Sequence, residues 1–418
     1  MASSIAQVRA SLAVVLCAAF VWAAVVPGAM AADDKKAPAL SAEVFKFLKP
    51  AQEAIGKGDF ETGYAQAKLG LEAAQTAKAK KPYDAQMALS LMAQASQGKK
   101  DYLALADALE QLNGVEGIAQ EQKNKSYRSL AQIYGQSAMY DKAVPYAKLW
   151  IEPGNGGAEA WGFLAKLYLI QKDCANGIVA LEKSVEGRQP TEIDLKLEYQ
   201  CYNTLGQKAK VTQALEALEA NFFTREYLIS LMSNYEAEGS DPHAMMNLWR
   251  LAFDRDFMTR ESEFIEYIDM ALEAGSPAEA LKVLETGIAK GAVKIISQTD
   301  SNARRLKQAK DLSADDRKNI AALDKEARAG KSGEADVKVG LAYFGLGEFD
   351  KAAESIERGL TPDRVGKVKR VDDAYMNLGV AYYKLGKKDL AEKAFTSAQT
   401  DARMARAAHV WLQALPKL

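Results

Sequence analysis

The stretch DAYMNLGVAYYKLGKKDLAEKAFTSA, residues Asp373–Ala398, decides the fold. Apolar residues recur in it at three- and four-residue steps on both sides of a turn at Gly386, which predicts two antiparallel helices. Small residues, Gly379 and Ala391, stand where the two helix axes must approach closely, and large side chains flank them. The expected core residues of this stretch are Tyr375, Leu378, Gly379, Tyr382, Ala391, Phe395 and Ala398.

This spacing resembles the tetratricopeptide repeat (TPR), a pair of antiparallel helices of about 34 residues. The same period separates Ala131 from Ala165, and Ala165 from Tyr199, so the pattern recurs along the chain. Alternating apolar and polar runs typical of strands are absent from the sequence. The resemblance implies an all-α fold, a right-handed TPR-like α-solenoid of about ten helical pairs with a C-terminal capping helix.

The pattern divides the chain into consecutive parts. Residues 1–31 resemble a secretory signal peptide, because Arg9 precedes an apolar run and Ala29 and Ala31 follow as a small-x-small cleavage site. Ser313 is expected to cap the second helix of a divergent pair. The expected parts after the signal are a disordered lead-in at 32–40, an N-terminal TPR-like array at 41–291, a degenerate helical pair at 292–331, C-terminal TPR pairs at 332–400 and a capping helix at 401–418.

The signal pattern is bacterial in style and predicts a periplasmic protein, with an uncleaved membrane anchor as the alternative. Beyond the signal the chain has two cysteines, Cys174 and Cys201. In an oxidising compartment an even pair favours a disulfide, and the repeat register places both toward the same end of neighbouring helices. The alternative is two separate, partly buried thiols.

The sequence contains few residues suited to catalysis. His243 and His409 are the only histidines and stand far apart, and we expect His243 in a solvated turn. No glycine-rich phosphate loop follows a strand pattern, and a net charge of −1 without a basic stripe argues against nucleic acid as a partner. We therefore expect a protein that is not an enzyme and that needs no metal or cofactor.

The predicted functional feature is a surface. In a TPR superhelix, the first helix of each pair lines the concave face. Applying this rule predicts a polar, partly cationic central groove and a more apolar one near the C-terminus, where Phe344 and Val380 would join the wall. The alternative is an ordinary solvated inner face. The proposed partner-binding residues are Arg128, Gln132, Lys166, Lys196, Gln200, Asn203, Met376 and Tyr383.

The stretch from Arg225 to Gly291 carries a more particular resemblance, to periplasmic TPR proteins encoded beside TonB, ExbB and ExbD. The residues that carry it are Gly275, Pro277, Ala280, Gly287 and Gly291, together with Ala408, Trp411 and Leu412 near the C-terminus. The resemblance implies a non-catalytic accessory role in TonB-dependent energy transduction. The implied partners are TonB, ExbB, ExbD or TonB-dependent receptors. The alternative function is an adaptor in envelope assembly or in the regulation of cell-wall synthesis.

Overall fold

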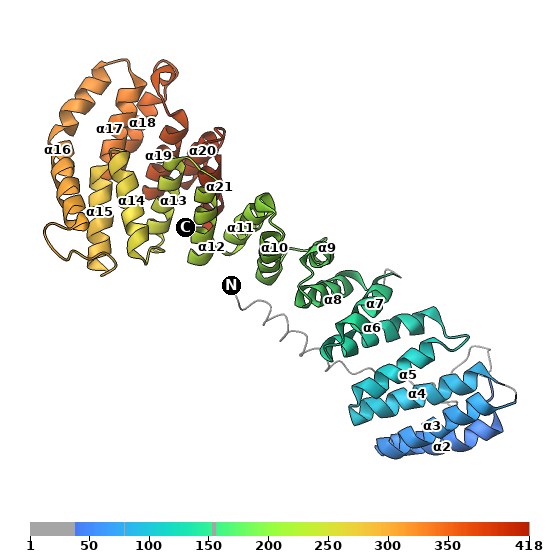
Figure 1. Cartoon of the computed structure of the whole chain (residues 1–418). Helices are drawn as coiled ribbons and strands as arrows, with labels where there is room; N and C mark the ends of the chain where they lie inside the picture. The colour runs from blue at the N-terminus through green and yellow to red at the C-terminus, as the bar shows by residue number, and fades with distance from the viewer. Residues whose placement is uncertain (1–37, 79, 153–155, 418) are drawn as a thin grey trace. The chain divides into compact units, whose positions relative to one another are not determined.

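The computed structural model describes residues 38–78, 80–152 and 156–417, and within these ranges the chain consists of helices and short connections (Figure 1). It confirms the all-α, TPR-like solenoid. The predicted signal peptide and most of the lead-in lie outside the described residues. The chain divides into an N-terminal unit ending at Lys208 and a C-terminal unit beginning at Ala209, so a boundary falls inside the array predicted at 41–291.

The N-terminal unit is a series of antiparallel helix pairs. In each of three pairs an aspartate caps the second helix: Asp59, Asp101 and Asp173 each accept a hydrogen bond of 3.1 Å from the backbone N–H three residues later. Its helices are α2 (Ala42–Gly56), α3 (Phe60–Thr76), α4 (Pro82–Lys99), α5 (Tyr102–Asn113), α6 (Gln120–Gln136), α7 (Tyr140–Ile151), α8 (Gly157–Ile170), α9 (Cys174–Val185) and α10 (Glu192–Thr204).

The C-terminal unit contains further pairs and one long helix. Its helices are α11 (Lys208–Phe222), α12 (Arg225–Ala237), α13 (Pro242–Asp254), α14 (Glu261–Glu273), α15 (Pro277–Ala289), α16 (Ser301–Ala329), α17 (Gly333–Gly345), α18 (Phe349–Gly359), α19 (Val371–Lys384), α20 (Lys388–Ala398) and α21 (Ala405–Ala414), with short 3₁₀ turns η2 (Val365–Lys367) and η3 (Leu415–Lys417).

The stretch that decided the fold forms α19 and α20, as predicted. Its expected core residues are buried except Tyr375, which is half-buried. At Gly379 a Cβ atom would lie 2.5 Å from Cδ1 of Phe395, so only glycine allows this helix approach. Gly386 has a φ of +71° and ends the first helix in the left-handed conformation.

Tyrosines at one repeat position connect successive pairs. The hydroxyl of Tyr202 donates to Glu182 at 2.8 Å, that of Tyr235 donates to Glu216 at 2.7 Å, and that of Tyr382 donates to Glu357. In each case the tyrosine lies on the first helix of a pair and the glutamate on the helix before it. All three tyrosines are buried and belong to the core, as predicted for Tyr382.

The prediction of a degenerate helical pair at 292–331 is wrong. Residues 301–329 form the single helix α16, about 43 Å long at the usual rise. No proline or glycine interrupts this segment, and Ser313, expected as a cap, is buried in mid-helix. The acidic residue three positions after Ser313 fits a helix interior as well as a cap, which explains the error.

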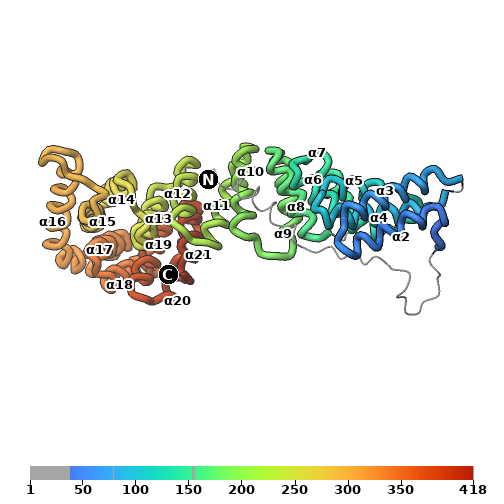
Figure 2. The backbone as a smooth tube through the Cα atoms, turned by 90° about the horizontal axis from the view of Figure 1, so that it is seen from below, coloured from blue at the N-terminus to red at the C-terminus, as the bar shows by residue number. Residues whose placement is uncertain are grey.

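After α16 the C-terminal unit folds back on itself. Figure 2 shows α12–α14 on one side of the unit and α17–α20 on the other, with α16 at the end where the chain turns. Helix α13 packs against α19 and α21, and α15 packs against α17. The predicted capping helix is α21, which contacts both α20 and α13 and buries Trp411 completely. It therefore closes the unit as well as covering the last pair.

Among the helices of the described ranges, none combines the length and the hydropathy needed to cross a bilayer.

Candidate functional site: a pocket in the C-terminal unit

The central groove residues lie on the surface of first helices, as predicted. Arg128 on α6 forms an ion pair of 2.6 Å with Glu159 and places its guanidinium 5.4 Å from the centroid of the Trp150 ring. Lys196 on α10 pairs with Glu192 at 2.8 Å. The others are half-buried or exposed: Gln132, Lys166, Gln200 and Asn203. Their role in partner binding stays a prediction.

Near the C-terminus, where a more apolar groove was predicted, α19 packs against α13, which covers Met376 and leaves Phe344 and Val380 in the wall of a cavity. Met376 is completely buried, whereas Val380 and Phe344, at most 6% exposed, border the cavity. Tyr383 is half-buried, and its hydroxyl donates to Oδ2 of Asp254 at 2.6 Å. Met376 and Tyr383 therefore contribute to the packing of α19 against α13, and their role in partner binding stays a prediction.

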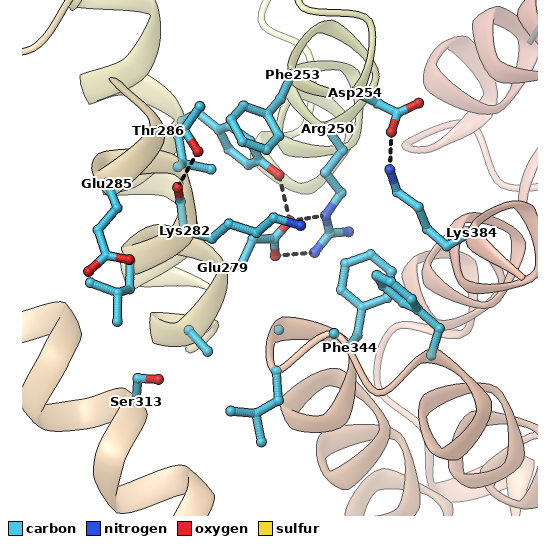
Figure 3. Close-up of a pocket in the computed structure, with 18 of the residues that line it drawn as sticks. Arg250, Phe253, Asp254, Glu279, Lys282, Glu285, Thr286, Ser313, Phe344 and Lys384 are labelled. Carbon is cyan, nitrogen blue, oxygen red and sulfur yellow. Dashed lines mark hydrogen bonds and ion pairs between the residues drawn. The ribbon is translucent and has the colours of Figure 1, made fainter. Parts of the chain in front are cut away.

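The fold-back leaves this cavity, of 670 Å³, between its two sides (Figure 3). Second helices α13 and α15 form one wall and first helices α17 and α19 the other, with α16 at the end. Volumes of this size are typical of binding pockets. The prediction considered only first helices and so did not anticipate a cavity wall formed by α13 and α15.

A buried ion pair forms one side of the pocket. Nε and Nη2 of Arg250 donate to the two carboxylate oxygens of Glu279 at 2.7 and 2.9 Å, and the two side chains are 6% and 9% exposed. Tyr267 Oη and Ser276 Oγ also donate to Glu279, at 2.5 and 3.0 Å. Arg250 reaches Asn377 on α19 at 2.5 Å, so this network ties α13, α14, α15 and α19 together.

The environment of the pair decides the protonation states. Burial by itself would raise the pKa of Glu279, but the charge of Arg250 and the hydrogen bonds from Arg250, Tyr267 and Ser276 lower that pKa below its usual value. Burial, followed by the negative charge of Glu279, raises the pKa of Tyr267 far above its usual value. Glu279 therefore remains a carboxylate and Tyr267 a neutral donor at physiological pH.

A second ion pair also borders the pocket. Lys384 of α19 pairs with Asp254 of α13, as Figure 3 shows. Burial, then the hydrogen bond to Asp254, raises the pKa of Tyr383 to about 12. Asp254 thus accepts from two residues of α19 and joins the two walls.

Two further cations line the pocket. Lys282 on α15 and Arg317 on α16 are both exposed, and neither forms an ion pair with any residue that the structure describes. In Figure 3 the Lys282 side chain extends over the pocket toward Arg250 and Glu279. The remaining acid of the wall, Glu285, lies 3.9 Å from Lys310.

His243 differs from its prediction as a solvated turn residue. It lies in the first turn of α13, half-buried, with Nδ1 3.3 Å from Oδ2 of Asp373 on α19. The hydrogen bond to Asp373 raises the pKa of the imidazole, although burial acts in the opposite sense. Within the described ranges, no cluster of histidine, cysteine and acidic side chains is suited to holding a metal ion.

The cysteines Cys174 and Cys201 meet across α9 and α10. Their sulfur atoms are 2.7 Å apart, and the structure holds them as thiols. Burial, then Cys174, raises the pKa of the Cys201 thiol. The geometry brings the predicted pair together, and its oxidation to a disulfide stays a prediction.

Comparison with known proteins agrees with this architecture. The family model of the tetratricopeptide repeat matches residues 372–400, which include most of α19 and all of α20. No curated protein matches the sequence.

Solved structures overlap the chain only loosely. MamA (residues 41 to the end) from Desulfovibrio magneticus RS-1 is 15% identical with a TM-score of 0.28, covering 48% of this chain and 100% of its own. A tetratricopeptide repeat protein from Parabacteroides merdae is 10% identical with a TM-score of 0.30, covering 64% and 99%. A structure of Naa15/Naa10 bound to HypK-THB is 13% identical with a TM-score of 0.33, covering 89% and 61%.

The matched repeat stands within an array of antiparallel helix pairs, and we conclude that the chain contains a tetratricopeptide repeat in an all-α, TPR-like solenoid.

Proposed function

We propose that the protein is a non-catalytic interaction scaffold and that the pocket of the C-terminal unit is its docking site for a protein partner. The observation that carries this proposal is the pocket itself. Its 670 Å³ lie between helices of a repeat array, and its wall combines apolar side chains with charged groups. Repeat arrays bind peptide segments on concave surfaces, and we assign the same use to this cavity between helices.

We propose further that the protein works in the periplasm as an accessory to TonB-dependent energy transduction. Two sequence features support this: the signal-peptide pattern of residues 1–31 and the resemblance of the stretch Arg225–Gly291 to TPR proteins encoded beside TonB, ExbB and ExbD. The partners would then be TonB, ExbB, ExbD or a TonB-dependent receptor.

Site-specific photocrosslinking in cells tests both levels of the proposal. A photoreactive amino acid replaces Leu346, which is half-buried in the pocket wall, and the matched control carries it at Leu323, an exposed position of α16 outside the wall. We expect the Leu346 position alone to capture a component of the TonB system. Capture of a cell-wall or outer-membrane assembly protein there would replace the TonB role by the adaptor role. Identical products from both positions would refute the pocket as a docking site.

A further inference from the structure

The pocket has an uneven charge distribution that points to the chemistry of its occupant. Arg250 is neutralised by Glu279, and Lys384 by Asp254, while Glu285 lies near Lys310. Lys282 and Arg317 are left over. From this surplus we infer that the pocket binds an acidic peptide segment of a partner protein, with a carboxylate against Lys282 and Arg317. The inference rests on the proposed function and names the partner's chemistry.

The position of the two cations supports a ligand contact rather than a structural role. They lie on successive helices, α15 and α16, and both border the pocket. Lys282 extends over the pocket toward Arg250 and Glu279, as Figure 3 shows. Carboxylates of the protein could have neutralised them, as Glu279 neutralises Arg250, yet none among the described residues does. Two like charges facing one hollow attract an anion and repel a cation.

The rest of the wall selects for apolar side chains beside the acid. Phe344 lies with its ring 4.6 Å from the guanidinium carbon of Arg250 and packs edge-on against Phe349, with ring centroids 5.3 Å apart. Phe253 and Leu346 also line the pocket. An extended peptide that alternates acidic and apolar residues could place one set against the cations and the other against this surface.

The buried pair has a separate role in this arrangement. Because Glu279 is satisfied by Arg250, Tyr267 and Ser276, it has little capacity left to compete for Lys282. The negative charge that would otherwise reduce the attraction for an acidic ligand is therefore balanced within the wall. An incoming peptide therefore encounters the positive charges of Lys282 and Arg317.

Selection from a random twelve-residue peptide library, displayed on phage and applied to the full chain, tests the inference. We expect the selected peptides to be rich in Asp and Glu beside Phe and Leu. A selected peptide, synthesised with a fluorescent label, should lose at least tenfold in affinity when its acids are replaced by the corresponding amides. Its affinity should also fall as salt is added.

Variants of the chain locate the binding. Lys282→Glu combined with Arg317→Glu should weaken the labelled peptide at least tenfold. The control, Lys318→Glu combined with Lys325→Glu, changes the net charge equally at exposed positions of α16 outside the pocket, and should alter affinity less than twofold. All four positions are exposed, so both variants should fold, which circular dichroism checks.

The outcomes separate the inference from the proposed function. Peptides that compete with one another for the pocket but show no preference for acids would overturn the inference and leave the docking site standing. An equal loss in both double variants would also overturn it, because the attraction would then be general rather than local. Failure to select any peptide that Leu346→Glu weakens would overturn the docking site as well.

Discussion

The two units are built from the same helix pairs but differ in how far along the sequence their contacts reach. In the N-terminal unit the main helix contacts join sequence neighbours from α2 to α10, with α2 also touching α4. In the C-terminal unit hydrogen bonds connect residues 127 and 164 positions apart, Arg250 with Asn377 and Trp411 with Asn247. An array of the first kind loses stability locally when one contact is removed, whereas a closed unit loses it as a whole.

The largest expected effect follows truncation of the residue that closes the C-terminal unit. Trp411 is completely buried, stacks on Phe395 with ring centroids 5.2 Å apart, and donates through Nε1 to the carbonyl of Asn247 at 2.9 Å. Trp411→Ala should destabilise this unit by about 3–5 kcal/mol. Hydrogen exchange read by mass spectrometry should show faster exchange throughout α12–α21 and no change in α2–α9.

Trp150→Ala is the matched substitution in the N-terminal unit, where the indole is 5% exposed. Its effect on exchange should stay within α6–α9, the helices around it. If Trp150→Ala instead accelerated exchange over the whole unit, the contrast between an open stack and a closed unit would be wrong.

Removing half of the buried ion pair should have an effect almost as large. Arg250→Met leaves Glu279 buried without its countercharge and should cost about 3–5 kcal/mol in urea unfolding. Adding Glu279→Gln to that variant should recover part of the loss, because the stranded charge is gone. The exposed pair Arg128–Glu159 in the N-terminal unit gives the comparison: Arg128→Met should cost about 1 kcal/mol or less. Equal losses at both sites would contradict the role assigned to burial.

The stability of the C-terminal unit should also depend on pH through one buried acid. Glu219 on α11 is 1% exposed, its Oε1 has no hydrogen-bond partner in the described structure, and burial raises the pKa of its carboxyl from 4.5 to about 7 despite the opposing charge of Lys417. Between those values the folded state keeps a proton that the unfolded state has released. Stability should therefore fall as pH rises from about 4.5 to about 7, by about 3 kcal/mol at most, and change little above.

Glu219→Gln isolates this effect, because the difference in unfolding free energy between it and the parent cancels the other groups. That difference should grow in favour of the variant between pH 4.5 and 7. Glu226→Gln, an exposed position on α12, is the control and should show no such growth. In the N-terminal unit the buried acid Asp84 accepts a hydrogen bond from the Ser41 backbone at 3.0 Å, so its carboxyl is satisfied.

The smallest effect is expected on the surface of the N-terminal unit. Lys196→Glu removes an ion pair with Glu192 one helical turn away and should change the unfolding free energy by less than about 0.5 kcal/mol. Thermal unfolding followed by circular dichroism measures this. A larger loss would place Lys196 in a structural contact and remove it from the partner-binding candidates.

The sequence predicted the helix pairs because close packing of two helices restricts residue type at fixed spacing. Gly379 faces Phe395 where no Cβ fits, and such requirements repeat with the period of the fold. The packing of α13 against α19 produces no periodic pattern in the sequence. It depends on single contacts between residues far apart in the chain, such as the hydrogen bond from Arg250 to Asn377. One clue was present: Arg250 stands among the apolar residues of α13, and a charge on such a face needs a buried partner.

The fold-back also has a mechanical consequence. In the C-terminal unit the last turn touches the first helix, since Lys417 donates to the carbonyl of Ala220. A force that pulls the two ends of this unit apart would act first on the hydrogen bond between Lys417 and Ala220 and on the contacts of Trp411. The helix pairs between them would be strained only afterwards. The main helix contacts of the N-terminal unit include none between its first and last helices. A pulling force would therefore be distributed over successive helix pairs, which extend gradually. One chain thus joins an extensible segment to one that resists force until it opens abruptly.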